Sequence, residues 1–450
     1  MSEGSLFGTS GIRGDAVKLF TDQFSFDIGR TFSIFLKNHK TEGWISIAND
    51  PRESSPRIKK FVTIGLQYEG REVYDDGVSP IPAMNWILRV EPAFAGSIMV
   101  SGSHIKADLN GLKFFAFGEE ILKEHEAEIN KIYGEIKDKV KVAGKKLNSN
   151  EVHEETRANE SYIEYLTSKA DRPYSEWKVV VDPGNGAQSE VAPETLKILG
   201  LQVVDMNTDI QQNFLSRDTE VEGDFVELQK RVKEEKADFG VGFDSDGDRV
   251  VFIDENGEFV PGDYSGTLIA RHLDHKEVVT PINTSQVVDK IGVKVIRTKV
   301  GSPFVVQQLK DKNIPFGFES NGGGIFDDMR SRDGGRSMIE FLNLLKKSKK
   351  KVSGLVAELP KFYISRDKVE YKWELKDEIL KRAKEKFKGV KIEEIDGLKI
   401  WVSDSTWILF RSSMNAPEFR VFVESESKEK SRKMLNDGMQ FVKDIVKENA

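Results

Sequence analysis

The sequence contains no cysteine and only six histidines among its 450 residues. The absence of cysteine excludes disulfides, thiolate metal sites and cysteine nucleophiles. The histidines are scattered along the chain, which argues against a metal site built from several of them. No apolar run is long enough to span a bilayer. The N-terminal stretch MSEGSLFGTSG also lacks the charged region and apolar core of a signal peptide. We therefore expect no contact with membranes and a cytoplasmic location.

The chain also lacks an excess of positive charge. Its formal net charge is −7, which argues against general nucleic-acid binding. At 450 residues it is too long for one hydrophobic core, and a length of about 100–200 residues per domain predicts two to four domains.

Three blocks of similar length repeat the order strand, helix, strand, helix, strand. They run from WISIAND to AGSIMV (44–100), from WKVVVD to DFGVGF (177–243) and from EVVTPI to IPFGF (277–318). Each block predicts a mostly parallel sheet with right-handed crossovers. The last 90 or so residues change this order to a strand, a charged helix, three strands and a helix, which predicts an α+β unit.

Each block ends its third strand in a polar, glycine-bearing loop. These loops begin with SGSH at 101, DSDGD at 244 and ESNGGG at 319. Ligands of such sheets bind beyond the carboxyl ends of the strands. The three loops are therefore placed where a ligand site belongs, and that they face one central cleft is a hypothesis.

The loop after the second block carries three aspartates at alternate positions, Asp244, Asp246 and Asp248. Like charges this close repel each other, so the pattern favours a divalent cation held by oxygen ligands. An EF-hand is the first alternative, but its sixth position requires glycine and here is Arg249. A solvated acidic turn without a metal is the second alternative.

Three further stretches carry candidate site residues. SGSHIKADLNGLKFF (101–115) contains Ser103, His104 and Lys113 but no G-x-S-x-G elbow, so a phosphoryl-carrying serine fits better than a serine hydrolase. FGFESNGGG (316–324) offers Glu319 and Asn321 to sugar hydroxyls. FRSSMNAPEFRVFVE (410–424) contains arginines, serines and Asn415, which match a phosphate monoester. An ordinary surface loop or hairpin remains the alternative for each.

DPGNGAQS (182–189) is interpreted as a tight turn with a helix cap, because the third glycine of a dinucleotide loop is absent.

Together these stretches resemble the α-D-phosphohexomutase family, which covers phosphoglucomutase, phosphomannomutase and phosphoglucosamine mutase. FGTSGIRG (7–14), NDPRESSP (49–56), GVSPIP (77–82), SGSHIKADLNGLK, DSDGDR and TKVG (298–301) match the family's motifs in order. The resemblance implies three related α/β domains with mixed, mostly parallel sheets and a C-terminal α+β domain around a central cleft. The domains expected are 1–150 with the phosphoserine loop, 151–256 with the metal loop, 257–362 with the sugar loop and 363–450 with the phosphate loop.

The resemblance also implies the roles of individual residues. The catalytic residues would be Ser103 as the phosphoserine, Lys113 as the general acid/base, Arg249, His104 and Arg13. Mg²⁺ would be held by Asp244, Asp246, Asp248 and a phosphate oxygen on Ser103. Substrate contacts would come from Glu319, Asn321, Arg411, Ser413, Asn415, Arg420, Thr9 and Ser10.

The implied reaction interconverts hexose 1-phosphate and hexose 6-phosphate, of glucose or mannose, with hexose 1,6-bisphosphate as intermediate and activator. The partner expected is a small phosphosugar, and the chain would be a monomer or homodimer. The sugar loop departs from the usual pattern at Asn321 and Gly323, and the phosphate loop departs at Asn415. Phosphoglucosamine mutase is therefore an alternative. A metal-dependent sugar phosphatase and a non-catalytic sugar-phosphate binding protein are further ones.

Overall fold

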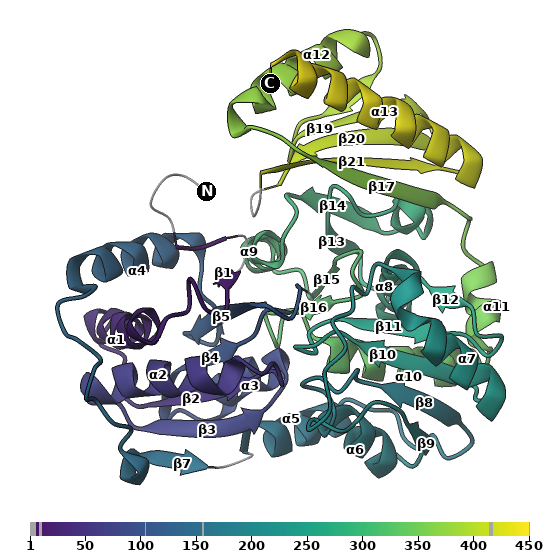
Figure 1. Ribbon diagram of the computed structural model, residues 1–450. Helices are drawn as coiled ribbons and strands as arrows, with labels where there is room; N and C mark the ends of the chain where they lie inside the picture. The colour runs from purple at the N-terminus through teal and green to yellow at the C-terminus, as the bar shows by residue number, and fades with distance from the viewer. Residues whose placement is uncertain (1–5, 9–10, 104, 155–156, 414–416, 450) are drawn as a thin grey trace.

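The computed structural model describes residues 6–8, 11–103, 105–154, 157–413 and 417–449. Its strands form four sheets that follow one another along the chain (Figure 1). The units built on these sheets are called domains 1 to 4 in chain order. In Figure 1 domain 1 lies at the left, domain 2 at the lower right and domain 4 at the top, with domain 3 between them.

Domain 1 contains a seven-stranded sheet with the order β1-β5-β4-β2-β3-β7, in which β6 pairs with β5. Its strands are β1 (Ile12–Asp15), β2 (Trp44–Asn49), β3 (Val73–Val78), β4 (Phe94–Val100), β5 (Leu109–Ala116), β6 (Glu119–Glu120) and β7 (Val152–Glu154). Its helices are α1 (Asp22–Asn38), α2 (Ser55–Tyr68), α3 (Ile81–Val90), α4 (Lys123–Ile136) and the 3-10 turn η1 (Ser149–Glu151).

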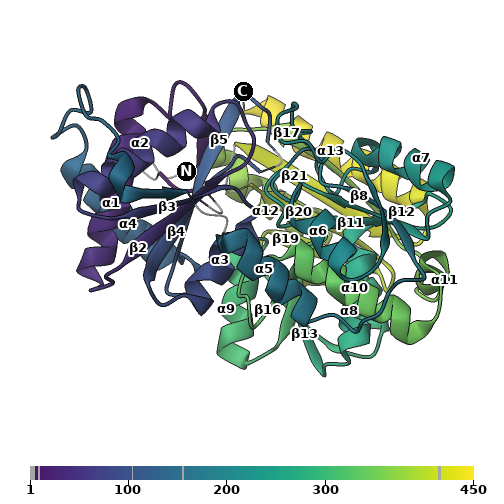
Figure 2. The same ribbon diagram turned by 90° about the horizontal axis from the view of Figure 1, so that it is seen from below.

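Domain 2 contains a five-stranded sheet with the order β12-β11-β10-β8-β9. Its strands are β8 (Lys178–Asp182), β9 (Gln202–Asp205), β10 (Phe239–Phe243), β11 (Val250–Ile253) and β12 (Phe259–Val260). Its helices are α5 (Arg157–Ser168), α6 (Val191–Ile198), the 3-10 turn η2 (Glu222–Phe225) and α7 (Val226–Glu235). Figures 1 and 2 both show α5 beside α3, so that this helix packs at the junction with domain 1.

Domain 3 contains a four-stranded sheet with the order β14-β13-β15-β16. Its strands are β13 (Glu277–Pro281), β14 (Lys294–Thr298), β15 (Phe316–Phe318) and β16 (Gly324–Phe326). Its helices are α8 (Gly262–Leu273), the 3-10 turn η3 (Gln286–Lys290), α9 (Ser302–Lys312), α10 (Gly334–Ser348) and α11 (Val352–Ala357).

Domain 4 is an antiparallel sheet with the order β17-β21-β20-β19-β18, covered by helices. Its strands are β17 (Tyr363–Glu370), β18 (Lys391–Glu393), β19 (Leu398–Ser403), β20 (Thr406–Ser412) and β21 (Glu418–Ser425). Its helices are the 3-10 turn η4 (Trp373–Leu375), α12 (Lys376–Lys386) and α13 (Lys428–Glu448). On α13, Leu435, Met439 and Val442 are buried at helical spacing, which directs one face onto the sheet.

The first three sheets share one topology, which confirms the predicted α/β class. In each, one strand (β2, β8 or β13) pairs in parallel with the next two strands of the chain, and the second of those two pairs with an antiparallel return strand (β5, β11 or β16). The serine loop (101–108) connects β4 to β5, the aspartate loop (244–249) connects β10 to β11 and the glutamate loop (319–323) connects β15 to β16. They correspond to the phosphoserine, metal and sugar loops of the resemblance. The three polar loops therefore occupy equivalent places in the three domains.

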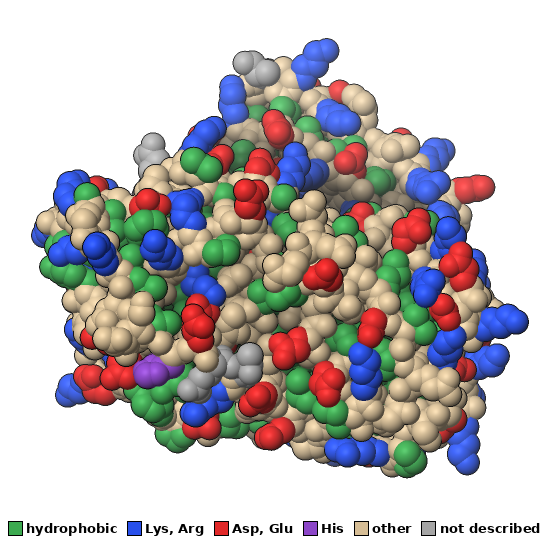
Figure 3. All heavy atoms as spheres, turned by 60° about the horizontal axis from the view of Figure 1, so that its bottom comes forward, with side chains coloured by type: hydrophobic (Ala, Val, Ile, Leu, Met, Phe, Trp, Pro, Cys, Tyr) green, Lys and Arg blue, Asp and Glu red, His purple; other side chains and the backbone are tan. Residues whose placement is uncertain are grey.

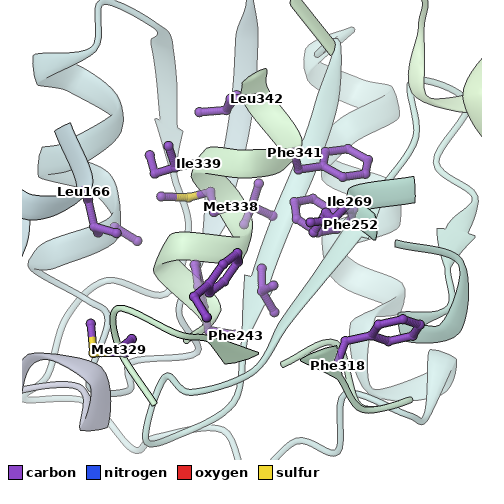
Figure 4. Close-up of a cluster of buried hydrophobic side chains, with 14 of the residues drawn as sticks. Leu166, Phe243, Phe252, Ile269, Phe318, Met329, Met338, Ile339, Phe341 and Leu342 are labelled. Atoms are coloured by element: carbon purple, nitrogen blue, oxygen red, sulfur yellow. The ribbon is translucent and has the colours of Figure 1, made fainter. Parts of the chain in front are cut away.

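One hydrophobic cluster runs through domains 1, 2 and 3 without interruption. It begins at Ala48 in β2 and ends at Phe362 before β17. Figure 4 shows part of it, where Phe243 and Phe252 of domain 2 lie close to Met338 and Phe341 of α10 in domain 3. Domain 4 has its own cluster, which lies between its sheet and its helices. The first three domains thus share one packed core. The fourth has a core of its own and contacts domain 3 through a small cluster of Ile282 with Trp407, Leu409 and Phe422.

Three local features differ from the sequence analysis. A strand that was not predicted, β7, follows η1 in the polar segment between the first two domains and pairs in parallel with β3. Residues 285–292, where the order of the third block predicted a helix, form only the short turn η3, and Gly292 beyond it has a φ of 82°. Domain 4 has four strands after α12 rather than three, because the three-residue β18 was missed.

The outer surface carries charges of both signs. In the face drawn in Figure 3, acidic and basic side chains are interspersed with hydrophobic ones. Among the helices in the described part of the chain, none combines the length and the apolar character needed to cross a membrane.

Candidate active site

The serine loop of domain 1 and the aspartate loop of domain 2 are in direct contact. Ser103 Oγ donates a hydrogen bond to Asp244 Oδ2 at 3.3 Å, and Ser245 Oγ donates one to the Ser103 carbonyl oxygen at 2.5 Å. All three residues are buried. These contacts bring together two loops that lie 141 positions apart in the sequence.

The three aspartates form a compact buried group. Each offers a carboxylate oxygen, and these oxygens lie within 4.8 Å of one another. Burial, with the charges of Asp246 and Asp248, raises the pKa of Asp244 well above the ordinary carboxyl value. Burial also acts to raise the pKa of Asp246. There the Lys113 ammonium and hydrogen bonds outweigh it and hold the pKa below the ordinary value.

Two oxygens of this group fit a metal ion. Asp246 Oδ1 and Asp248 Oδ1 are buried and have no hydrogen-bond partner among the described residues. A buried carboxylate oxygen without a partner is costly unless a cation or water meets it. An all-oxygen set of this kind is what Mg²⁺ and similar hard cations bind. The three aspartates could therefore hold a divalent cation.

Cationic side chains surround the aspartates. Lys113 on β5 is 2% exposed, and its Nζ lies 2.9 Å from Asp246 Oδ2 and 3.4 Å from Asp248 Oδ2. The Nε of Arg249 lies 3.6 Å from Asp244 Oδ2 and 3.7 Å from Asp248 Oδ1. Arg13 on β1 is close enough that the charges of Asp246 and Arg249 act on it, and burial lowers its pKa.

The DPGNGAQS turn (182–189) forms hydrogen bonds with the backbone of the aspartate loop. Ala187 N–H donates to the Ser245 carbonyl at 2.9 Å, and Gln188 Nε2 donates to the Gly247 carbonyl at 3.0 Å. Gly247 has a φ of 69°, and a Cβ there would lie 2.5 Å from Gln188 Cγ. The predicted tight turn is therefore present and fixes the aspartate loop. The helix cap is not, because Glu190 at the start of α6 makes no side-chain cap.

The glutamate loop reaches the same site through an arginine that the sequence reasoning missed. Arg332 donates to Asp248 Oδ2 at 2.8 Å and to Glu319 Oε2 at 3.1 Å. Arg332 lies in a short polar segment before α10. It belongs to no periodic pattern and to none of the stretches that match the family's motifs, so the sequence did not mark it as a site residue. Asn321 Oδ1 accepts from Gly323 N–H at 3.2 Å, so this side chain also stabilises its own loop.

The phosphate-loop residues of domain 4 lie on adjacent strands. Arg411 on β20 and Arg420 on β21 are directly opposite each other in the sheet. Arg411 Nε pairs with Asp396 Oδ2 at 2.6 Å, and Arg420 pairs with Glu418 at 3.1 Å. Asp396 also accepts from the Val300 N–H of the TKVG segment at 3.0 Å.

The two arginines and Ser413, which follows β20, are thus gathered at one end of the domain 4 sheet. The two arginines form ion pairs with Asp396 and Glu418 of domain 4. Four predicted site residues fall outside the described residues, namely Thr9, Ser10, His104 and Asn415.

Comparison with known proteins identifies the class to which this fold and site belong. Residues 4–140, 160–257 and 261–363 match the models of the phosphoglucomutase/phosphomannomutase α/β/α domains I, II and III, respectively. The chain belongs to the α-D-phosphohexomutase family, whose members are enzymes that isomerise phosphosugars.

Two curated relatives and one solved structure illustrate the likeness. The chain is 36% identical to a phosphoglucomutase/phosphomannomutase of Thermococcus kodakarensis, with 99% of this chain and 100% of the relative covered. It is 31% identical to a phosphoglucosamine/phosphogalactosamine mutase of Sulfurisphaera tokodaii, with 96% and 98% covered. The crystal structure of a phosphoglucomutase/phosphomannomutase family protein from Burkholderia thailandensis superposes with a TM-score of 0.81 at 24% identity, with 99% and 98% covered.

Proposed function

We propose that this enzyme interconverts the 1- and 6-phosphates of glucose or mannose through a phosphorylated Ser103 and a hexose 1,6-bisphosphate. The observation that carries the proposal is the 3.3 Å contact of Ser103 Oγ with Asp244. The hydroxyl thus contacts a carboxylate group that is suited to a divalent cation, and another member of this group, Asp246, pairs with the Lys113 ammonium. A serine that carries a phosphoryl group needs such neutralising charge.

The cation proposed is Mg²⁺, held by Asp244, Asp246 and Asp248 together with a phosphate oxygen on Ser103. When bound, it neutralises charge on the phosphoryl group during transfer. The orphaned oxygens of Asp246 and Asp248 support this assignment.

The chemistry assigned to the chain's own residues is phosphoryl and proton transfer. The bond from Ser103 Oγ to phosphorus breaks as the free sugar hydroxyl bonds to the same phosphorus. The Lys113 ammonium gives a proton to the leaving Ser103 oxygen, and the amine so formed takes the proton of the sugar hydroxyl. Arg249 and Arg13 stabilise the charge that develops. The bisphosphate then turns over, and its other phosphoryl group returns to Ser103. Positioning and electrostatics supply most of the rate.

Substrate contacts are assigned to the two loops from domains 3 and 4. Glu319 and Asn321 hold sugar hydroxyls in either orientation, and Arg411, Ser413 and Arg420 hold the phosphate that is not reacting. Thr9, Ser10, His104 and Asn415 complete this assignment from outside the described residues. The arginine forks support phosphate binding, because two parallel N–H groups match two phosphate oxygens.

Phosphoglucosamine is the second candidate substrate. Asn321 and Gly323 depart from the usual sugar loop, and the relatives include mutases of both glucose-type and amino sugars. A metal-dependent sugar phosphatase that uses the same loops is a third candidate function, and it would release inorganic phosphate instead of forming the 6-phosphate.

A phosphorus NMR panel tests the proposal. The 1-phosphates of glucose, mannose, glucosamine and N-acetylglucosamine are incubated with the enzyme, Mg²⁺ and a trace of bisphosphate. We expect conversion of one or more to the 6-phosphate, which also ranks the sugars. Release of inorganic phosphate alone would favour the phosphatase.

Two variants make the test specific to Ser103. Ser103→Ala is expected to abolish conversion. Ser431→Ala serves as the matched control. Ser431 is equally buried, but it lies on α13, and its hydroxyl forms hydrogen bonds with Ser365 and with the Lys428 carbonyl, both within domain 4. Full activity of Ser103→Ala would remove the phosphoserine from the mechanism.

A further inference from the structure

Arg52, in the loop before α2, is bound to the backbone of the serine loop. It is 1% exposed, and its Nε donates to Asp50 Oδ2 at 2.9 Å. Its two terminal nitrogens donate to four carbonyl groups of the serine loop. These are the carbonyls of Ser103, Ile105 (2.9 Å), Lys106 (2.8 Å) and Leu109 (3.1 Å). One guanidinium thus fixes the backbone at the residue proposed to carry the phosphoryl group and at three positions after it.

The backbone held in this way is strained at the reacting residue. Ser103 has a φ of 53°, in the left-handed region that is unfavourable for a residue with a Cβ. Such conformations cost about 1–3 kcal/mol and persist only where the surroundings impose them. The Ser103 carbonyl accepts from Arg52 and from Ser245 Oγ, and these two bonds supply the constraint. In this conformation the Ser103 hydroxyl contacts Asp244.

The loop is shaped to receive the guanidinium. A Cβ at Gly102 would lie 2.9 Å from Arg52 Cζ, so any larger residue there would displace the arginine. The Phe214 ring of domain 2 lies with its centroid 4.6 Å from the same carbon, and Ser216 Oγ donates to the Ile105 carbonyl at 2.9 Å. The arrangement therefore ties the serine loop to domain 2 as well as to α2.

We propose that Arg52 is a positioning residue for phosphoryl transfer, which holds Ser103 in the left-handed conformation that aims its oxygen at the aspartates. The inference rests on the proposed function, because it assumes that Ser103 carries the phosphoryl group. Without the guanidinium the loop relaxes, and the phosphoserine turns away from the aspartates and Lys113. Transfer to the sugar then slows relative to hydrolysis by water.

The test compares Arg52→Lys with Arg71→Lys. Arg71 is a matched control, because it is 3% exposed and its guanidinium also binds two backbone carbonyls, those of Gly43 and Thr41, outside the site. The enzyme is labelled at Ser103 with radioactive bisphosphate. The rate of label transfer to sugar phosphate and the rate of label loss to water are then measured, together with kcat and KM.

We expect Arg52→Lys to lower kcat on the order of 10²-fold, the penalty typical of a misplacement near 1 Å. KM is expected to change little, because the sugar contacts are untouched. The ratio of hydrolysis to transfer is expected to rise. Arg71→Lys is expected to keep the wild-type ratio, even if its melting temperature falls. Gly102→Ala retains the arginine but displaces it, so it is expected to reproduce the raised ratio if Arg52→Lys fails to fold.

Two results would overturn the positioning role of Arg52 and leave the proposed function intact. One is a wild-type ratio in both Arg52→Lys and Gly102→Ala, and the other is the same rise in Arg71→Lys. Failure of the proposed function gives a different result. The wild-type enzyme would then take no label at Ser103, or Ser103→Ala would remain active, and the positioning role would fall with it.

Discussion

Replacing Lys113 by methionine tests the electrostatic balance of the site. The variant keeps an unbranched chain of similar length and removes the ammonium group that lies 2.9 Å from Asp246 Oδ2 and 3.4 Å from Asp248 Oδ2. The aspartates are essentially inaccessible to solvent, so the lost attraction is not replaced by water. Removing one partner of a buried ion pair costs about 3–5 kcal/mol. We expect a loss of this size in the free energy of unfolding of Lys113→Met measured in EDTA.

Mg²⁺ is expected to restore much of that loss. The ammonium and the cation draw on the same carboxylates, so the variant gains more from the metal than the wild-type enzyme does. A ligand at one hundred times its dissociation constant stabilises a protein by about 2.7 kcal/mol. Catalysis is not restored, and we expect turnover to fall about 10²–10⁴-fold, the usual contribution of a general acid/base.

The assay is thermal unfolding in EDTA and in saturating MgCl₂, with turnover measured on the same samples. Lys399→Met is the control, because Lys399 is also buried but lies in domain 4, with its Nζ 4.0 Å from the Trp407 ring centroid. This control should lose stability equally with and without metal. A Mg²⁺-induced shift in Lys113→Met no larger than in the wild type would refute the reasoning, as would unchanged stability in EDTA.

Further variants probe the surroundings of the site. Burial raises the pKa of Asp333 from 3.8 to about 7. Its contribution to stability is therefore complete below pH 4 and is lost as the pH rises through 7, on the order of 4 kcal/mol in all. Asp333→Asn should weaken the dependence of the urea-unfolding midpoint on pH between pH 4 and 8. A midpoint that falls with pH as steeply as in the wild type would contradict this assignment. Gly322→Ala should destabilise by about 3 kcal/mol or more, because φ is 83° and a Cβ would lie 1.9 Å from the Val250 carbonyl oxygen; calorimetry showing a wild-type melting temperature would disprove it. Glu424→Gln should cost about 2–3 kcal/mol, because the buried carboxylate accepts from Ser285, Gln286 and Trp407; an unaltered unfolding midpoint would show that this network adds little.

The sequence predicted the three repeated blocks because most of their buried strands are followed by a helix of different period, although β13 is followed only by the turn η3. It also predicted where the polar loops lie, since the carboxyl ends of the third strands are fixed by that order. The meeting of Ser103 with Asp244 could be anticipated only through the family motifs, because spacing along the chain does not determine how domains 1 and 2 pack.

Arg52 and Arg332 show what the sequence could not predict. Each donates to groups far away in the chain, and Arg332 contacts Asp248 across 84 positions. Arg52 lies in NDPRESSP, one of the stretches that match the family's motifs, but nothing in that stretch indicates a contact with the serine loop. The partners of both arginines are backbone carbonyls or carboxylates that folding brings near. The strand β7 was missed for a related reason. Its three residues lie in a polar segment, and only pairing with β3 makes them a strand.

The uninterrupted core of the first three domains has a consequence for biosynthesis. That core draws on residues from Ala48 to Phe362, so its last contributors leave the ribosome only after four-fifths of the chain has been made. Domains generally fold as units as they emerge, but here the first cannot bury its share of the cluster until the third is present. The nascent chain must therefore carry an exposed apolar surface for most of its synthesis. Domain 4 has a core of its own and needs none of the shared cluster. Domain 1 has a second, separate cluster on α1, α2 and α4, so only the part of its apolar surface that belongs to the shared core has to wait.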